Sequence, residues 1–320
     1  MADVVAGLAV FGAVIAVGWL LVRTRAVPAD ADGVLTRVCF FAATPALLVT
    51  TLSRADMTAV VSRATAVAVA AELAAIVSAW CLHRLVLRRS TAEATIVALA
   101  SGYVNAANLG IPVAVLVLGD AATIAPILLL QLLVLTPVTF TVLDAVTRRG
   151  NPSRLATLTV PLRNPLLWGV VAGTAANLGG VDLEHWCGGY PAQGLEMLGR
   201  VAVPLMMLAL GMSLAGVPRP PQNLEPDVPA RGVSRRSGLC LAVGWKLAVM
   251  PGLAVVVGLA AGLSGAQLLV PVVTAALPTA QNVFMYASRY GVGKDLARDA
   301  VLLTTAGFVP VVLLAAAILR

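Results

Sequence analysis

The sequence is poor in charge for a protein of its length. Only 12% of its 320 residues are charged and 5% are aromatic, whereas about a quarter of a typical soluble domain is charged. A soluble helical protein needs polar residues along the outer face of each helix, and this chain has too few to supply them. The shortage of charge therefore excludes an ordinary soluble domain.

Cysteine and histidine are also scarce. The chain has no CxxC spacing, its two histidines (His83 and His185) are far apart, and the HExxH, GxSxG and P-loop motifs are absent. We expect no metal, no cofactor and no enzymatic activity, and an enzyme embedded in the membrane is the less favoured alternative. The cysteines are predicted to be small buried hydrophobic residues. They are Cys39, Cys81, Cys187 and Cys240.

Apolar residues dominate the composition of the chain. They account for 59% of the chain, the mean hydropathy is +0.93, and apolar runs of about 20 residues recur, which is the length of a membrane-spanning helix. The fold class predicted is an all-α integral membrane protein with ten transmembrane helices. The predicted spans are Val4–Val22, Val34–Leu52, Ala59–Leu82, Ala94–Leu118, Ala121–Val146, Leu166–Leu178, Leu195–Val217, Leu239–Leu263, Ala266–Ser288 and Ala300–Leu319.

The net charge of +7 reflects topology rather than nucleic-acid binding, because the basic residues lie in short loops between apolar runs. Seventeen of the 22 Lys and Arg residues fall on one side of the ten spans and four on the other. Positive residues favour the cytoplasmic side. We therefore expect the loops Thr147–Arg163 and Pro218–Gly238 to be cytoplasmic and both termini to lie outside the cell membrane.

Five predicted spans stand on each side of the first of these loops, which predicts an internal repeat. Because five is odd, the second half would be inverted in the membrane. Pro45 in the second span and Pro204 in the seventh lie at similar positions. The predicted organisation is a first five-helix repeat at 1–147, a connecting loop at 148–163 and a second repeat at 164–320.

The fourth span contains residues that interrupt a helix. Asn105, Asn108, Gly110 and Pro112 occur within eight residues. Proline removes a backbone donor and clashes with the preceding turn, while amide side chains can bond freed carbonyls or a ligand. We predict a break near mid-membrane, held at Pro112.

The ninth span carries a matching group, Pro278, Gln281 and Asn282. If the two breaks cross, two half-helix N-termini meet, and their positive dipole ends favour an anion. These residues and those of the fourth span are the predicted substrate site. The alternative is that the prolines only kink the helices and the amides bond neighbouring helices.

Two ionisable residues lie inside predicted spans. Glu72 is near the middle of the third and Lys246 is about two turns into the eighth. Charges at such depth are costly and face a partner or a wet path. We interpret them as an ion pair or as a proton-linked coupling site, with Lys246 extending to the membrane edge as its alternative.

Several stretches resemble the auxin efflux carrier family of transporters, which includes bacterial malate and malonate permease-like members. They are Asn105-Ala-Ala-Asn-Leu-Gly-Ile-Pro112, Leu277-Pro-Thr-Ala-Gln-Asn282, Asn164-Pro165 and Val203-Pro-Leu-Met206 followed by Gly211. The resemblance implies two inverted five-helix repeats with crossed broken helices in spans 4 and 9, as in bile acid/sodium symporters. It also implies a scaffold of spans 1, 2, 6 and 7, often dimeric, and an elevator-type transport domain of spans 3–5 and 8–10. The long cytoplasmic loop of plant carriers is absent.

The expected function is a secondary transporter or facilitator of a small organic anion. Coupling to H⁺, to Na⁺ or to no ion is left open, and so is a homodimer. A channel is the main alternative, although paired discontinuous helices favour a carrier.

The charge bias makes the topology testable. Alkaline phosphatase fused after Arg154 should be inactive, because that loop is predicted to be cytoplasmic, and the same enzyme fused at the C-terminus should be active. Phosphatase activity of fusions in the two positions measures the orientation. The opposite pattern of activities would overturn it.

Overall fold

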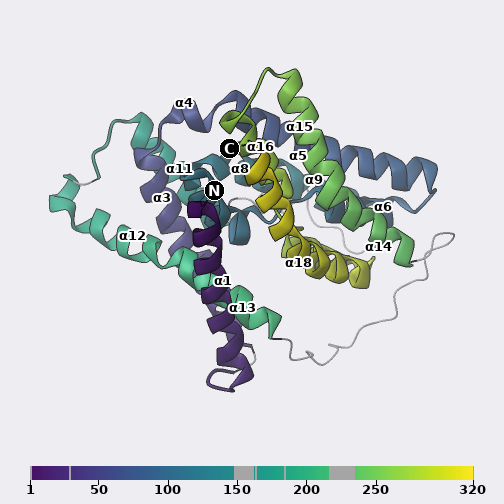
Figure 1. Ribbon diagram of the computed structural model, residues 1–320, viewed down its shortest axis with the longest axis horizontal. Coiled ribbons are helices and arrows are strands. Elements are labelled where there is room, and N and C mark those ends of the chain that lie inside the picture. Colours follow the sequence, from purple (N-terminus) through teal and green to yellow (C-terminus); the bar gives the residue numbers. More distant parts are fainter. Residues whose placement is uncertain are drawn as a thin grey trace. The chain divides into compact units, whose positions relative to one another are not determined.

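The computed structural model describes residues 2–28, 30–147, 162, 164–183, 185–215 and 235–319. Throughout these residues the secondary structure is helical, without a β-strand (Figure 1), which confirms the all-α class. Most of the predicted connecting loop at 148–163 and most of the proline-rich loop at 218–238 lie outside the described residues.

Six helices are long and apolar enough to cross a membrane, and four more apolar helices are shorter. Large apolar side chains on them are widely exposed; Leu178, for example, is 74% exposed. A surface of this kind requires lipid, so the chain is a multi-pass membrane protein. The long helices are Ala31–Arg54, Arg63–Val86, Ala121–Thr147, Tyr190–Met212, Arg236–Ala260 and Lys294–Leu319, and the short ones are Gly12–Arg23, Ala106–Leu118, Pro165–Leu178 and Ala266–Ala276.

In several of these helices a proline is preceded by a short π-helical segment. A five-residue π-helical segment ends two residues before each of four prolines. A proline lacks the backbone N–H and its ring collides with the carbonyl one turn earlier, and the wider π turn makes room for it without breaking the helix. The pairs are η1 (Cys39–Ala43) with Pro45, η3 (Ala106–Gly110) with Pro112, η6 (Gln131–Leu135) with Pro137, and η9 (Trp245–Val249) with Pro251.

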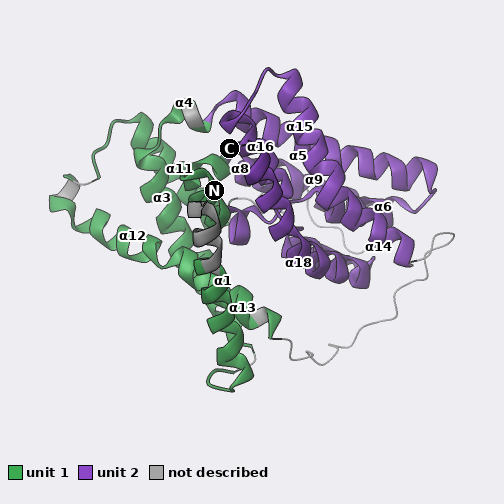
Figure 2. Ribbon diagram, viewed as in Figure 1, with its two compact units in different colours: residues 1–60, 111–125, 162–222 green, residues 61–110, 126–161, 223–320 purple. Residues whose placement is uncertain are grey.

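The contacts divide the chain into two compact units, each assembled from segments far apart in sequence (Figure 2). Unit 1 comprises Met1–Val60, Ile111–Ala125 and Leu162–Gln222. In it α1 packs on α13, and α3 packs on α11 and α12. Besides η1, its helices are α1 (Ala2–Arg23), α2 (Ala31–Val38), α3 (Thr44–Arg54), α4 (Met57–Val60), α7 (Ile111–Val113), η4 (Ala114–Leu118), η5 (Ala121–Ile124), α11 (Pro165–Leu178), η8 (Trp186–Gly189), α12 (Tyr190–Arg200) and α13 (Ala202–Leu214).

Unit 2 comprises Val61–Gly110, Pro126–Pro161 and Asn223–Arg320. A hydrophobic cluster in this unit includes Ile96, Leu143 and Val283. Besides η3, η6 and η9, its helices are α5 (Arg63–Cys81), η2 (Leu82–Val86), α6 (Thr91–Gly102), α8 (Ala125–Leu130), α9 (Thr136–Thr147), α14 (Arg235–Gly244), α15 (Met250–Ala260), α16 (Ala266–Ala276), α17 (Gln281–Tyr290) and α18 (Lys294–Leu319).

Two expectations from the sequence are wrong. The fourth apolar segment is interrupted at residues 103–105 and not at Pro112, because η3 widens ahead of this proline and α7 carries it inside the helix. Cys240 is exposed rather than buried, since it lies on a helix of an apolar protein whose outer surface is itself apolar. Cys39 is buried, as predicted.

Close helix packing in unit 1 depends on small residues in α11. A Cβ atom added at Gly169 would lie 2.9 Å from the Cα atom of Pro45, and one added at Gly173 would lie 2.9 Å from the carbonyl oxygen of Leu48. These glycines, four residues apart, let the backbones of α11 and α3 approach.

Gly173→Ala should therefore lower the thermal unfolding midpoint of the purified protein. Overpacking of this kind destabilises by about 1–3 kcal/mol. Gly12→Ala, on α1 of the same unit, is the matched control, because a Cβ atom there meets nothing within 4 Å. Equal midpoints for the two variants would show that the α3–α11 contact is looser than described.

Candidate functional site

The two interrupted helices meet inside unit 2. The backbone N–H of Asn105 donates to the Pro278 carbonyl at 2.8 Å, and the N–H of Ala280 donates to the Tyr103 carbonyl at 3.0 Å. Val104 and Thr279 thereby form an isolated antiparallel bridge. Each break thus supplies part of the hydrogen bonding that the other has lost, as burial of backbone polar groups demands.

Two buried side chains bond the backbone groups that are freed at the first break. Glu72 Oε1 accepts from the backbone N–H of Val104 at 3.2 Å and from Gln131 Nε2 at 2.8 Å. Gln131 Nε2 also donates to the Val104 carbonyl at 2.8 Å. Both polar groups of Val104 are therefore satisfied by side chains. The second carboxylate oxygen, Glu72 Oε2, is buried without a hydrogen-bond partner.

Two threonines make the hydrogen bonds at the second break. The backbone N–H of Thr279 donates to Thr304 Oγ1 at 3.0 Å, and the hydroxyl of Thr279 donates to the Ala100 carbonyl at 2.6 Å. Both threonines are fully buried. Thr304 lies on α18. This helix therefore supplies a hydrogen-bonding side chain to the second break, as the helix of Gln131 does to the first.

Lys246 lies beside the second break and not at the membrane edge. Its side chain is fully buried, and Nζ donates to the Ala275 carbonyl at 2.7 Å and to Met250 Sδ at 3.0 Å. Ala275 is in the last turn of α16, where carbonyls lack helical partners and the helix dipole favours a cation. Burial rules out the alternative that Lys246 extends to the surface.

Glu72 and Lys246 are both fully buried in the interior of unit 2. No direct ion pair joins these two described side chains, because each is bonded to groups at a different break. The acid binds a freed N–H and the base binds a freed carbonyl. Both side chains therefore satisfy buried backbone groups near the crossing, independently of any role in transport.

The predicted asparagines stand where the fourth segment restarts. Asn105 is buried, and its Oδ1 accepts from the backbone N–H of Asn108 at 3.3 Å. Its carbonyl accepts from the N–H of Gly110 at 2.8 Å. Asn105 thus acts as the N-terminal cap of η3. The amide of Asn108 is half-buried and has no hydrogen bond among the described residues.

The predicted residues of the ninth segment begin α17. Gln281 and Asn282 follow the bridge at once and are exposed, and no side chain caps the first turn of α17. Their amides make no hydrogen bonds to described residues. Pro278 belongs to the bridge itself. The crossing therefore places two helix N-termini and three unengaged amides (Asn108, Gln281 and Asn282) beside one short bridge, and such groups are suited to an anion.

Pro112 is the predicted site residue that this arrangement does not include. It is buried in α7, which belongs to unit 1. Unit 1 also has a hollow of about 430 Å³ between α3 and α12, with Arg54 and Asp120 in its wall. Arg200 in the same wall pairs with Glu196 at 2.6 Å, so part of its charge is already compensated.

Sequence reasoning missed the aromatic part of unit 2. Thr136 Oγ1 lies 3.3 Å from the Tyr103 hydroxyl and 3.1 Å from the Tyr286 hydroxyl, and the two rings make an edge-to-face contact. This cluster fixes Tyr103, the residue at which α6 stops. Only the position of Tyr103 immediately before the asparagines could have drawn attention to it.

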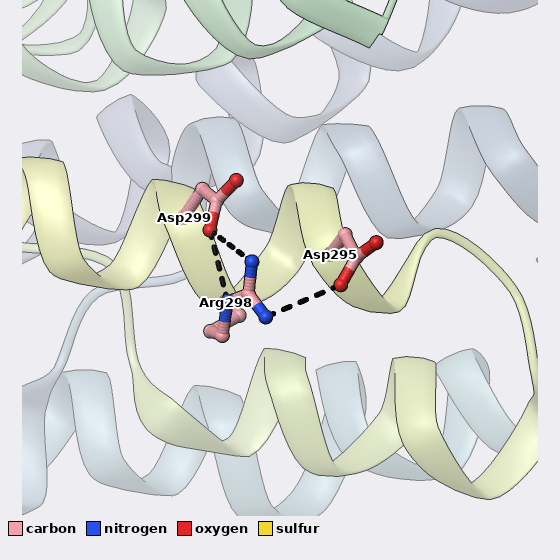
Figure 3. A network of polar contacts seen from close by, with 3 residues as sticks. All are labelled: Asp295, Arg298 and Asp299. Atoms are coloured by element: carbon pink, nitrogen blue, oxygen red, sulfur yellow. Dashed lines mark hydrogen bonds and ion pairs between the residues drawn. The ribbon is translucent and has the colours of Figure 1, made fainter. Parts of the chain in front are cut away.

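Three charged side chains in the first two turns of α18 contact one another. Arg298 contacts Asp295 at 3.3 Å and Asp299 at 2.8 Å (Figure 3). Exposed pairs of this kind stabilise little. Their local compensation makes Arg298 a poor candidate for attracting a substrate.

Comparison with known proteins agrees with the composition and the helices. The family model described as "Membrane transport protein" matches residues 5–153 and 154–316. A protein of Rhizobium meliloti (strain 1021) is 29% identical over 321 residues, which cover 95% of this chain and 92% of that protein. The relative is named "Putative malonate transporter".

Removal of the Gln131 amide should destabilise the crossing. Gln131→Leu leaves the Val104 carbonyl without its donor and takes one hydrogen bond from Glu72, and an unsatisfied buried group costs about 1–3 kcal/mol. The thermal unfolding midpoint should fall. Gln267→Leu, at an exposed position in the first turn of α16, should leave it nearly unchanged. Equal midpoints for the two variants would mean that the Val104 bonds are dispensable.

Proposed function

This chain belongs to the membrane transport protein family, the family of the auxin efflux carriers that its sequence resembles, and on that premise we propose that it carries a small organic anion. The proposed binding site is the crossing of the two broken helices. The observation that carries the proposal is the set of amides beside the crossing that have no partner in the described protein, namely those of Asn108, Gln281 and Asn282.

A carboxylate is the substrate class that suits these groups best. Amide and backbone N–H donors bind an anion without burying a full positive charge, and the dipoles of two helix N-termini add positive potential. The relative named for malonate transport supports a small dicarboxylate as the first probe. Lys246 is a less suitable ligand, because its ammonium already bonds Ala275 and Met250.

We further propose ten spans in two inverted repeats and an elevator-type cycle. Unit 2 holds the crossing and would be the moving transport part, whereas unit 1, with predicted spans 1, 2, 6 and 7, would be the scaffold. The short apolar helices of both units support this count, because each piece of a broken span needs fewer residues than an uninterrupted span. A homodimer and the cell membrane as the location stay predictions.

A channel is the second candidate. Both functions are compatible with the same helices, but a carrier binds its substrate in each cycle and a pore does not. Labelled malonate should therefore accumulate transiently in proteoliposomes preloaded with unlabelled malonate. A flux that stays linear with concentration and shows no exchange would favour the channel.

Asn108→Ala should impair transport without loss of stability, because its amide bonds no described residue. Loss of one hydrogen bond to a charged ligand should raise the apparent malonate constant about 10-fold to 150-fold. The measurement is initial uptake into proteoliposomes across a range of malonate concentrations. The thermal unfolding midpoint is recorded on the same preparations.

The matched control is Asn177→Ala. The Asn177 amide donates to the carbonyls of Ser53 and Ala55, at 3.0 and 2.9 Å, so it is an amide that packs helices together. This variant should lower the unfolding midpoint and leave the apparent constant unchanged. If Asn108→Ala behaved in the same way, the amides at the crossing would be packing groups and the substrate site would lie elsewhere.

Glu72 is proposed to couple transport to protons. Its Oε2 atom is buried with no hydrogen-bond partner, so a proton could bind there while Oε1 keeps its bonds to Val104 and Gln131. Glu72→Gln retains an oxygen at the Oε1 position and removes the titration. Uptake by the variant should therefore become insensitive to pH over the range in which wild-type uptake varies.

The control for this prediction is Glu196→Gln, the same chemical change at the partner of Arg200. It should keep the wild-type pH profile of uptake. An unchanged profile in Glu72→Gln as well would remove Glu72 from the coupling mechanism and leave it as a structural ligand of the Val104 N–H.

A further inference from the structure

We propose that Arg89, at the junction of η2 and α6 in unit 2, binds the phosphate of an anionic membrane phospholipid. The observation that supports this proposal is a buried guanidinium with no hydrogen-bond partner. Arg89 is only 4% exposed, and both Nε and Nη2 are buried with no hydrogen-bond partner. No other group of the described residues supplies a hydrogen bond to this side chain.

An isolated buried guanidinium is an expensive feature. Burial lowers the pKa of Arg89, yet an arginine side chain stays protonated in proteins. Its charge must then be compensated by an anion, since an unpaired buried charge is strongly destabilising. The carboxylate that acts on it electrostatically is Glu93. Glu93 Oε2, however, accepts from the backbone N–H of Ser90 at 3.2 Å and from its hydroxyl at 3.1 Å, as part of the cap of α6.

The surrounding backbone holds Arg89 in this position. Arg88 adopts a left-handed conformation with φ of 53°, and the N–H of Arg89 donates to the His83 carbonyl at 2.9 Å. The guanidinium lies against α14, where Nη2 is 2.5 Å from the place that a Cβ atom on Gly238 would take. His83 Nδ1 is a second buried nitrogen with no partner. The junction therefore holds two buried side chains with unpartnered nitrogens, and the nearby carboxylate, Glu93, is engaged in the cap of α6.

The location indicates a lipid as the source of the anion. The candidate span Arg63–Val86 ends three residues before Arg89, and lipid phosphates lie at the ends of membrane spans. Leu85 and Val86, just before the junction, are 64% and 68% exposed, which provides apolar surface for acyl chains. The planar fork of arginine matches a phosphate in bidentate fashion, and Arg88 and Arg84 add positive charge nearby.

The test uses the full-length protein in neutral detergent and dioctanoyl phosphatidylglycerol as the probe. Its thermal unfolding midpoint is measured against the lipid concentration. Wild-type protein should be stabilised with a saturable dependence. Arg89→Gln should weaken the apparent lipid affinity by about 10-fold or more, because it removes a charged hydrogen-bond donor. Dioctanoyl phosphatidylcholine and inorganic phosphate at equal concentrations should give smaller shifts.

Two further variants separate a specific site from general attraction. Arg88→Gln, an exposed neighbour, loses the same charge and should change the affinity by about threefold or less. Arg89→Lys keeps the charge without the fork and should fall between the wild type and Arg89→Gln. If Arg89→Gln does not fold, Arg89→Lys decides the matter, and wild-type lipid affinity in it would contradict the proposal.

Three other results would overturn the site as a lipid site. They are wild-type affinity in Arg89→Gln, an equal loss in Arg88→Gln, and an equal shift with inorganic phosphate, which would identify a soluble anion as the ligand. An equal shift with phosphatidylcholine would show that acyl chains alone are recognised. None of these results bears on the transport function, because Arg89 lies outside the proposed substrate site.

Discussion

The structure depends on the hydrogen bonds of a backbone that leaves its helix inside a membrane protein. Hydrocarbon cannot satisfy a freed N–H or carbonyl, and each one costs several kcal/mol if it is left unpaired. At Val104 and Thr279 the chain meets this demand with one short bridge and with side chains brought from three other helices. Lys246, from a fourth helix, bonds the Ala275 carbonyl just before the second break. Glu72, Gln131, Lys246 and Thr304 are thus required where they are, and their presence makes the interruption stable.

The polar side chains near the crossing in unit 2 fall into two groups, according to whether they are hydrogen-bonded to the chain. One group is engaged with the chain, as Gln131 is with Val104 and Glu72. The other group, which includes Asn108 and Asn282, stands at helix starts with no described partner. The second group is available to a ligand. This division connects the packing of the crossing to its proposed role in binding an anion.

The sequence predicted the location of this crossing better than its construction. Prolines and amides in two matching segments were sufficient to indicate two breaks, because few other functions explain such residues in an apolar run. The break was wrongly assigned to Pro112, because a π turn can absorb a proline and composition does not reveal it. Thr304 was not predicted at all, since a threonine in a helix usually bonds its own preceding turn, and only the spatial approach of α18 gives it a second task.

The measurement that tests the central claim most directly is protection of the crossing by substrate. Asn282→Cys is prepared in a background without the four native cysteines, and its rate of reaction with a water-soluble thiol reagent is measured in proteoliposomes. Gln267→Cys, exposed in the first turn of α16, is the control. We predict that malonate slows labelling at 282, that neutral malonamide does not, and that position 267 is unaffected by either. Equal labelling of Asn282→Cys with and without saturating malonate, in vesicles that still transport malonate, would contradict the claim that the anion binds at the crossing.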